Sequence, residues 1–273
     1  MCRDCGCGLG IGDVRIDAHY HGHGHEHEHT HTHEPQHVHG HHTHGDEHHQ
    51  FQPTLKLNRS LMEKNERLAE RNRGFFQAKK LLVLNVVSSP GSGKTTLIRE
   101  TAIRLKGNLR MGVIVGDLAT DNDAAKLKTA GIPVVQITTG TVCHLDAEMV
   151  SKAAAQLDLE KFDVLVIENV GNLVCPADYD LGEDLRIVLL STTEGEDKPL
   201  KYPPMFHSAS VAVVTKSDLA SAAGFDRTQA LANLRRVSHH AEVFELSATT
   251  LAAHGQTRLA PGPALCGGRR HGP

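Results

Sequence analysis

The string SSPGSGKTT at residues 88–96 contains the residue types that bind a chain of phosphates. Gly91 and Gly93 allow backbone N–H groups to approach phosphate oxygens closely. Lys94 can reach the β- and γ-phosphates, and the hydroxyl of Thr95 can bind Mg²⁺. The string lies between a strand-like run and a helical one, which is the context of a P-loop, although Ser88 stands where the general pattern has Gly. The candidate nucleotide-binding residues here are Gly91, Ser92, Gly93, Lys94, Thr95 and Thr96.

Acidic residues follow two later apolar runs and could bind magnesium. Asp117 ends the run MGVIVGD, and its carboxylate can reach Mg²⁺ directly or through water. Asp121 can position the attacking water, although Asp121 or Asp123 could instead cap the helix that begins there. Glu168 ends the run DVLVIE and can contact the water shell of magnesium, while Gly171 can offer its backbone N–H to the γ-phosphate. The candidate catalytic residues are Lys94, Asp117 and Asp121.

The late string TKSD at residues 215–218 indicates selection of guanine. Asp218 could accept two parallel hydrogen bonds from guanine, a donor pair that adenine lacks. Lys216 could lie over the base, and Ser247 and Ala248 follow a later strand as the element that supports the base. The usual GTPase pattern has Asn where this chain has Thr215, and TKSDL could instead be a helix N-cap.

Two groups of cysteine and histidine have the chemistry of metal ligands. Cys2, Cys5 and Cys7 lie within seven residues of the free α-amine. Three thiolates and an amine can surround Ni²⁺ in a plane, whereas tetrahedral sulfur suits zinc. The alternative is a flexible tail with unused thiols. Because the cysteines cluster, metal binding is favoured over structural disulfides.

The second group is Cys143, His144 and Cys175. Cys175 comes four residues after Gly171, a distance of at most about 14 Å along the chain. A loop that moves with the γ-phosphate should therefore also move this thiol. The alternative is that both cysteines are small buried apolar residues.

A low-complexity tract holds 15 of the 21 histidines, from His19 to His49. It has almost no aliphatic residues, so it cannot form a core and is predicted to be disordered without metal. Its imidazoles predict binding of several metal ions with moderate affinity.

Strand-like apolar runs alternate with helical patterns through the rest of the chain. The predicted strands are 81–88, 111–117, 134–138, 163–168, 186–191, 210–215 and 242–246, and the predicted helices are 54–73, 95–105, 122–130, 145–157 and 227–237. Most strand runs are continuously apolar, as in a parallel sheet covered on both faces. The pattern predicts an α/β, doubly wound, mostly parallel sheet of the P-loop NTPase type.

Composition divides the chain into four parts. We expect a Cys-rich head at 1–17, the His-rich tract at 18–52, a P-loop domain at 53–250 and a disordered Gly/Pro/Arg-rich tail at 251–273. The net charge of -3 does not indicate the basic surface of a nucleic-acid-binding protein. No run approaches the ~18 apolar residues that a membrane span needs. The predicted compartment is the cytoplasm.

These motifs together resemble the HypB family of hydrogenase nickel-incorporation GTPases. CxxCGC, PGSGKTT, GDLATDND, GTVCHLDA, ENVGNLVCPA and TKSDL occur in the family's order, over residues 1–7 and roughly 54–250. The resemblance implies a SIMIBI-like, slow regulatory GTPase that uses GTP/GDP and Mg²⁺ and holds Ni²⁺ or Zn²⁺. It also implies a homodimer formed on GTP or metal binding, with a HypA-like nickel chaperone and a [NiFe]-hydrogenase large-subunit precursor as partners.

The resemblance assigns roles to both metal groups. Cys2, Cys5 and Cys7 match a tight nickel site, and Cys143, His144 and Cys175 match a site near the dimer interface. Two alternatives remain, a nickel storage protein that works through the His tract and a urease-type nickel GTPase. The tail after Ala248 departs from the family, which continues into a glycine-containing loop and a closing helix, so one flank of the sheet could be exposed.

Overall fold

The computed structural model describes residues 15–17, 51–250 and 253–258. The predicted Cys head with Cys2, Cys5 and Cys7 and the His tract from His19 to His49 lie outside these residues. The predicted disorder of the N-terminal extension is wrong at Arg15–Asp17, which form strand β1, and at Phe51 and Gln52, which begin the helix Phe51–Ala78. The rest of that prediction lies outside the described residues.

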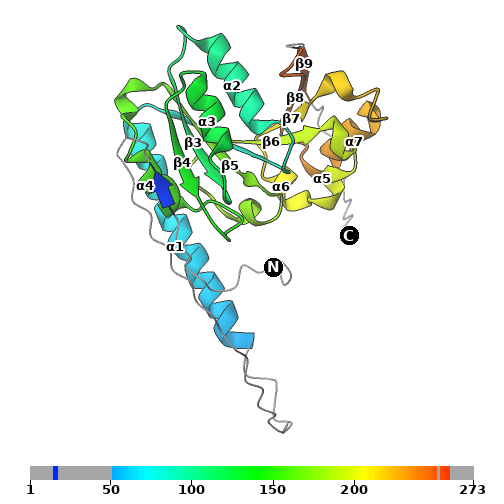
Figure 1. Ribbon diagram of the computed structural model, residues 1–273. Coiled ribbons are helices and arrows are strands. Elements are labelled where there is room, and N and C mark those ends of the chain that lie inside the picture. Colours follow the sequence, from blue (N-terminus) through cyan, green and yellow to red (C-terminus); the bar gives the residue numbers. More distant parts are fainter. Residues whose placement is uncertain (1–14, 18–50, 251–252, 259–273) are drawn as a thin grey trace, which may run out of the picture.

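A nine-stranded sheet forms the centre of the protein, in the order β1-β4-β3-β5-β2-β6-β7-β8-β9 (Figure 1). The strands after β1 are β2 (Leu82–Ser88), β3 (Met111–Asp117), β4 (Val134–Thr138), β5 (Val164–Gly171), β6 (Leu185–Ser191), β7 (Val211–Thr215), β8 (Glu242–Leu246) and β9 (Ala253–Arg258). The seven strands from β2 to β8 pair in parallel, and β1 and β9 are antiparallel additions at the two edges. The prediction of a doubly wound, mostly parallel sheet is confirmed.

Helices cover both faces of this sheet. They are α1 (Phe51–Ala78), α2 (Lys94–Leu105), α3 (Asn122–Thr129), α4 (Ala147–Ala154), α5 (Lys198–Lys201), α6 (Pro203–His207) and α7 (Arg227–Val237). Ile98 of α2 and Leu127 of α3 pack on one face. Residues of α1 and α4, and farther along of α6 and α7, pack on the other. Because both faces are covered, the central strands are apolar over most of their length, and β5 is buried from Val164 to Val170.

The prediction that residues 251–273 are disordered is wrong for Ala253–Arg258. These residues form β9, which pairs with β8. Their sequence AHGQTR has no apolar run, so no periodicity predicts a strand. An edge strand nevertheless offers a row of unpaired backbone groups, and pairing with them does not require an apolar side chain. The flank at β8 that we expected to be exposed is therefore paired along its backbone.

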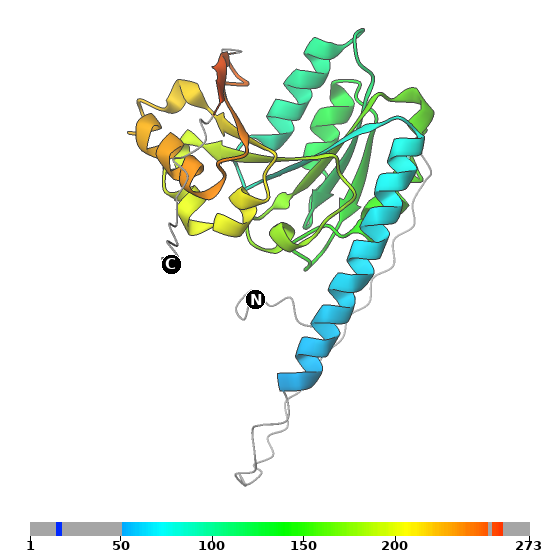
Figure 2. The same ribbon diagram turned by 180° about the vertical axis from the view of Figure 1, so that it is seen from behind.

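Helix α1 extends past the edge of the sheet and docks by its later turns (Figure 2). Phe76 is fully buried in the core. Two buried asparagines attach the helix to the start of α4 and to the loop before β6. The Asn65 amide donates to Asp180 O at 2.8 Å, and Asn72 donates to Ala147 O and Leu181 O at 2.8 and 3.1 Å. Neither α1 nor any other helix in the described residues combines the length and apolarity needed to cross a membrane.

We predict that Asn72→Ala lowers the free energy of unfolding by about 1–3 kcal/mol, because two carbonyl groups lose their buried donor. Urea denaturation followed by circular dichroism measures this loss. Arg71→Ala, at an exposed position on the same helix, serves as the control and should change the free energy of unfolding by less than about 0.5 kcal/mol. Equal effects of the two substitutions would contradict the anchoring role of Asn72.

Candidate nucleotide and metal site

The carboxyl ends of the parallel strands meet at one edge of the sheet, and the predicted site residues lie there. The phosphate loop follows β2, Asp117 ends β3, and the loop with Cys143 and His144 follows β4. Glu168 and Gly171 lie at the end of β5. The TKSD string and Ser247 follow β7 and β8, which are neighbours. This edge is where open α/β sheets bind ligands.

The phosphate loop has the backbone that close approach to an anion requires. Gly91 and Gly93 have φ of 75° and 96°, in the left-handed region that favours glycine. Helix α2 begins at Lys94, so its free N–H groups face the loop. The Lys94 ammonium lies 3.2 Å from Ser88 Oγ and is 9% exposed. Burial lowers its pKa, and the charge of Glu168 acts in the opposite direction. Ser88, the departure from the general pattern, thus contacts the lysine directly.

Thr95 and Glu168 are brought together, as magnesium binding would require. Thr95 Oγ1 donates to Glu168 Oε1 at 2.6 Å. Glu168 is 2% exposed, and burial is the main cause that raises its pKa to about 7. Its second oxygen, Oε2, is buried and has no hydrogen-bond partner within the described residues. An orphaned carboxylate oxygen beside a hydroxyl suits a hard divalent cation such as Mg²⁺.

Asp117 and Asp121 share no hydrogen bond with this pair in the described residues. Asp117 Oδ1 accepts the N–H groups of Ala119 and Thr120 at 3.0 and 2.8 Å. No hydrogen bond joins it to Thr95 in the part of the chain that the structure describes. The pKa of Lys94 is lowered by burial, and the charge of Asp117 opposes this lowering less than that of Glu168 does. Asp121 is exposed at the first position before α3, and its side chain makes no capping bond.

Gly171 contacts the phosphate loop from the next strand. It pairs with Ser88 across the sheet. A Cβ at this position would lie 2.9 Å from Pro90 Cγ and 3.0 Å from Pro90 Cα. Because real Cβ atoms do not approach so closely, only glycine permits this contact. The end of β5 and the phosphate loop are therefore closely packed at this point.

The TKSD string also contacts the phosphate loop. Thr215 Oγ1 donates to Ser92 O at 2.8 Å, so this departure from Asn still makes a side-chain bond to the loop. Lys216 Nζ donates to Gly91 O at 2.7 Å. Asp218 is exposed, and Ser247 is 2% exposed at the end of β8. Ala248 is half-buried beside it.

Sequence reasoning missed Glu194, which the structure places against the phosphate loop. Ser92 Oγ donates to Glu194 Oε1, and Lys198 Nζ lies 3.7 Å from Glu194 Oε2. Lys198 also lies 3.5 Å from Ser89 Oγ. The string TTEGEDK follows β6, which is adjacent to β2 in the sheet. Its place after a strand is the signal that could have drawn attention to it.

Cys143, His144 and Cys175 form a cluster, called the internal metal cluster below. One ligand atom from each lies within 4.8 Å of the others, and the two Sγ atoms are 2.8 Å apart. His144 Nδ1 is buried and has no hydrogen-bond partner among the described residues. Burial lowers the pKa of His144, which favours the neutral imidazole that binds metals. Two thiols and a neutral imidazole suit Ni²⁺ or Zn²⁺.

Two side chains position this cluster. The ring of Tyr179 stacks on His144, with centroids 3.8 Å apart and planes 25° apart. Asn172 Nδ2 donates to Cys143 O at 3.1 Å, and Asn172 Oδ1 accepts from Val174 N at 2.9 Å. Asn172 directly follows Gly171, so it links the end of β5 to the Cys143 loop. Sequence reasoning did not identify either residue.

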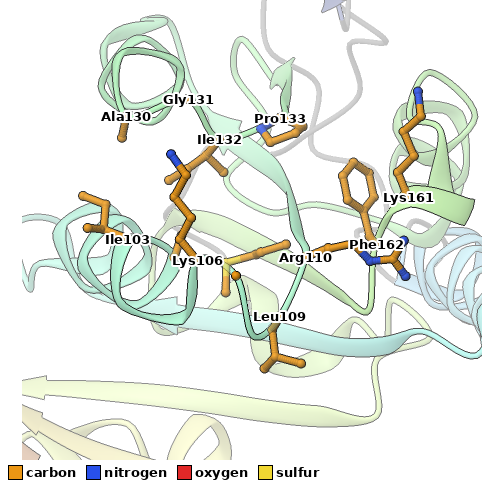
Figure 3. A pocket seen from close by; sticks show the side chains of 13 residues that line it. Ile103, Lys106, Leu109, Arg110, Ala130, Gly131, Ile132, Pro133, Lys161 and Phe162 are labelled. Carbon is orange, nitrogen blue, oxygen red and sulfur yellow. The ribbon is translucent and has the colours of Figure 1, made fainter.

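A separate cavity of about 470 Å³ lies at the opposite edge of the sheet (Figure 3). Its lining includes Ile103 and Lys106 at the end of α2, Met111 at the start of β3 and Phe162 just before β5. None of the predicted site residues lines it. It therefore belongs to neither the phosphate loop nor the internal metal cluster.

Comparison with known proteins gives consistent matches. The CobW/HypB/UreG nucleotide-binding domain family matches residues 82–245. A hydrogenase maturation factor HypB of Escherichia coli K12 is 52% identical over 196 residues, covering 72% of this chain and 68% of the relative. A hydrogenase/urease maturation factor HypB of Helicobacter hepaticus is 42% identical over 195 residues, covering 70% of this chain and 80% of that relative.

A solved structure agrees with these sequence matches. The crystal structure of HypB from Helicobacter pylori in complex with nickel is 41% identical and superposes with a TM-score of 0.66. The match covers 68% of this chain and 87% of that one. With the phosphate loop, the sheet order and these similarities together, the chain belongs to the HypB family of hydrogenase maturation factors.

Proposed function

We propose that this protein hydrolyses GTP and uses its nucleotide state to hold and release Ni²⁺ during maturation of a [NiFe] hydrogenase. One observation carries the proposal: a single short segment touches both sites. Glu168 contacts Thr95, Gly171 packs on Pro90, and Cys175 lies in the internal metal cluster. The nickel complex of the Helicobacter pylori relative supports nickel as the cargo. Zn²⁺ is the other ion that these ligands suit.

The phosphate loop supplies the nucleotide-binding part of this function. Lys94 holds the β- and γ-phosphates, and the N–H groups at the start of α2 surround them. Thr95 and Glu168 would hold Mg²⁺, with Asp117 reaching its water shell, and the ion would neutralise phosphate charge. Asp121 is our candidate for orienting the attacking water. Because hydrolysis serves as a signal here, we propose a slow, regulatory rate.

Guanine recognition is proposed for the TKSD end of the site. The exposed Asp218 carboxylate is available to accept from the base, and Lys216 leaves β7 with φ of 56°. Ser247 and Ala248 lie at the end of the neighbouring strand β8 and would support the base. Thr215 bonds the phosphate loop rather than the base, so we propose that it links the two parts of the nucleotide site.

The remaining parts of the proposal concern other molecules and the N-terminal extension. We propose a homodimer on GTP or metal binding, a HypA-like nickel chaperone and the large-subunit precursor of a hydrogenase as partners, all in the cytoplasm. Cys2, Cys5 and Cys7 would form a tight nickel site. The His tract would store nickel. A urease-directed role is the second candidate, which the dual hydrogenase/urease name of the Helicobacter hepaticus relative favours.

We predict that Lys94→Ala lowers GTP hydrolysis by about 100-fold or more, because the buried cation that faces the phosphates is removed. In a deletion strain this variant should fail to restore hydrogenase activity, while bulk nickel binding by equilibrium dialysis stays normal. Lys128→Ala, at an exposed position on α3, is the control and should behave as the native chain. Full hydrogenase activity with Lys94→Ala would favour a storage protein instead. Loss of urease with retained hydrogenase would favour the urease role.

A second prediction concerns Gly171→Ala. The added Cβ would overlap Pro90, and overpacking of this kind costs about 1–3 kcal/mol. We expect affinity for a GTP analogue to fall by about 10-fold, as measured by fluorescence titration. Gly74→Ala in α1 is the matched control, because a Cβ there meets nothing within 4 Å and should leave the affinity unchanged. Native affinity in Gly171→Ala would show that this contact does not constrain the phosphate loop.

A further inference from the structure

A buried ion pair lies beneath the turn that carries Cys175. Arg186 of β6 and Glu183 just before it have side chains only 9% and 7% exposed. Arg186 Nε and Nη2 lie 3.0 and 2.9 Å from Glu183 Oε1. Glu183 Oε2 accepts from Leu181 N at 2.8 Å. The pair is therefore fully engaged, and none of the polar atoms of the two side chains is left orphaned in the described structure.

The outer nitrogens of Arg186 bind the turn itself. Nη1 donates to Ala177 O at 3.1 Å and to Ser208 Oγ at 3.0 Å, and Nη2 donates to Tyr179 O at 2.8 Å. Residues 175–179 are called the Cys175 turn below. One guanidinium thus binds this turn through two of its backbone carbonyls. A planar fork of donors fixes the direction of such carbonyls, whereas a lysine ammonium does not.

The Cys175 turn carries one ligand of the internal metal cluster and the aromatic ring that stacks on another. Cys175 begins the turn, and its Sγ lies 2.8 Å from Cys143 Sγ. Tyr179 ends the turn, and its ring stacks on His144. Arg186 binds the middle of the turn at Ala177 and its end at Tyr179. It therefore fixes the residue whose ring stacks on His144 and the backbone two residues after Cys175.

A second set of bonds ties the ion pair to the centre of the sheet. Asn85 of β2 is fully buried, and its amide donates to Glu183 Oε1 at 3.0 Å. Asn169 of β5 donates to Asn85 Oδ1 at 3.3 Å. Asn169 is the residue after Glu168, so the polar chain runs from the magnesium-binding strand to the Cys175 turn.

Stability alone does not account for this arrangement. A buried ion pair is often no better for stability than apolar residues of similar volume, because both charges lose water. What the pair adds is geometry, since each donor has one acceptor in a fixed direction. We propose that Arg186, held by Glu183, is a further positioning residue of the internal metal cluster. This inference rests on the proposed metal-binding function.

Nickel titration of the full chain tests the inference. Cys2, Cys5, Cys7 and Cys266 are replaced by Ser, so that the thiolate charge-transfer absorption of Ni²⁺ reports Cys143 and Cys175. We expect Arg186→Lys to weaken this binding by at least 10-fold while GDP affinity stays within two-fold. Arg73→Lys is the matched control, because Arg73 binds Asp180, the residue directly after the same turn. It should keep nickel affinity within two-fold.

If Arg186→Lys does not fold, a second pair of variants tests whether the Cys175 turn positions the internal metal cluster. Tyr179 is only half-buried, so its replacement should leave the fold intact. Tyr179→Ala should weaken nickel binding by at least 5-fold, and Tyr179→Phe should restore it, because the ring and not the hydroxyl stacks on His144. Native nickel affinity in folded Arg186→Lys, or in Tyr179→Ala, would overturn the inference. No thiolate absorption in the parent chain would overturn the proposed metal function itself.

Discussion

The contact between Gly171 and Pro90 is the constraint on which the rest of the site depends. The end of β5 lies so close to the phosphate loop that no side chain fits between them. We infer that a change in the loop on nucleotide exchange would be passed to the residues that follow Gly171. Those residues are Asn172, which bonds the Cys143 loop, and Cys175, which lies beside Cys143. The short segment from Gly171 to Cys175 and the close packing of Gly171 thus link nucleotide binding to metal binding, which would otherwise be independent.

The charged side chains at the phosphate loop suit a ligand that carries both phosphate groups and a metal ion. Lys94 and Glu168 are both buried, and burial opposes the charged form of each. Glu194 adds a second carboxylate next to Ser92. A buried cation and buried carboxylates in one place are costly without partners. Phosphate oxygens and Mg²⁺ would supply those partners, so we infer that nucleotide binding relieves this cost.

Sequence reasoning succeeded where the signal is local and failed where it depends on distant contacts. The seven parallel strands were predictable because strands buried on both faces are apolar throughout, and the phosphate loop because its glycines and lysine are adjacent. Cys143, His144 and Cys175 were predicted as a group by their chemistry, and the structure brings them together. Glu194 gave only the signal of its place after a strand, and Asn172 and the Glu183–Arg186 pair gave none, because their partners lie far away in sequence or are backbone groups. β9 was missed because backbone pairing at an edge needs no apolar pattern.

We infer that nucleotide state changes metal binding through the segment from Glu168 to Cys175. The most direct test of this inference is a Ni²⁺ titration of the internal metal cluster in the chain with Cys2, Cys5, Cys7 and Cys266 replaced by Ser, once with GDP and once with a non-hydrolysable GTP analogue. Both states should be measured at the same Mg²⁺ concentration. A coupling of ordinary size predicts that the two affinities differ by about 5-fold or more. Identical affinities in the two states would contradict the account.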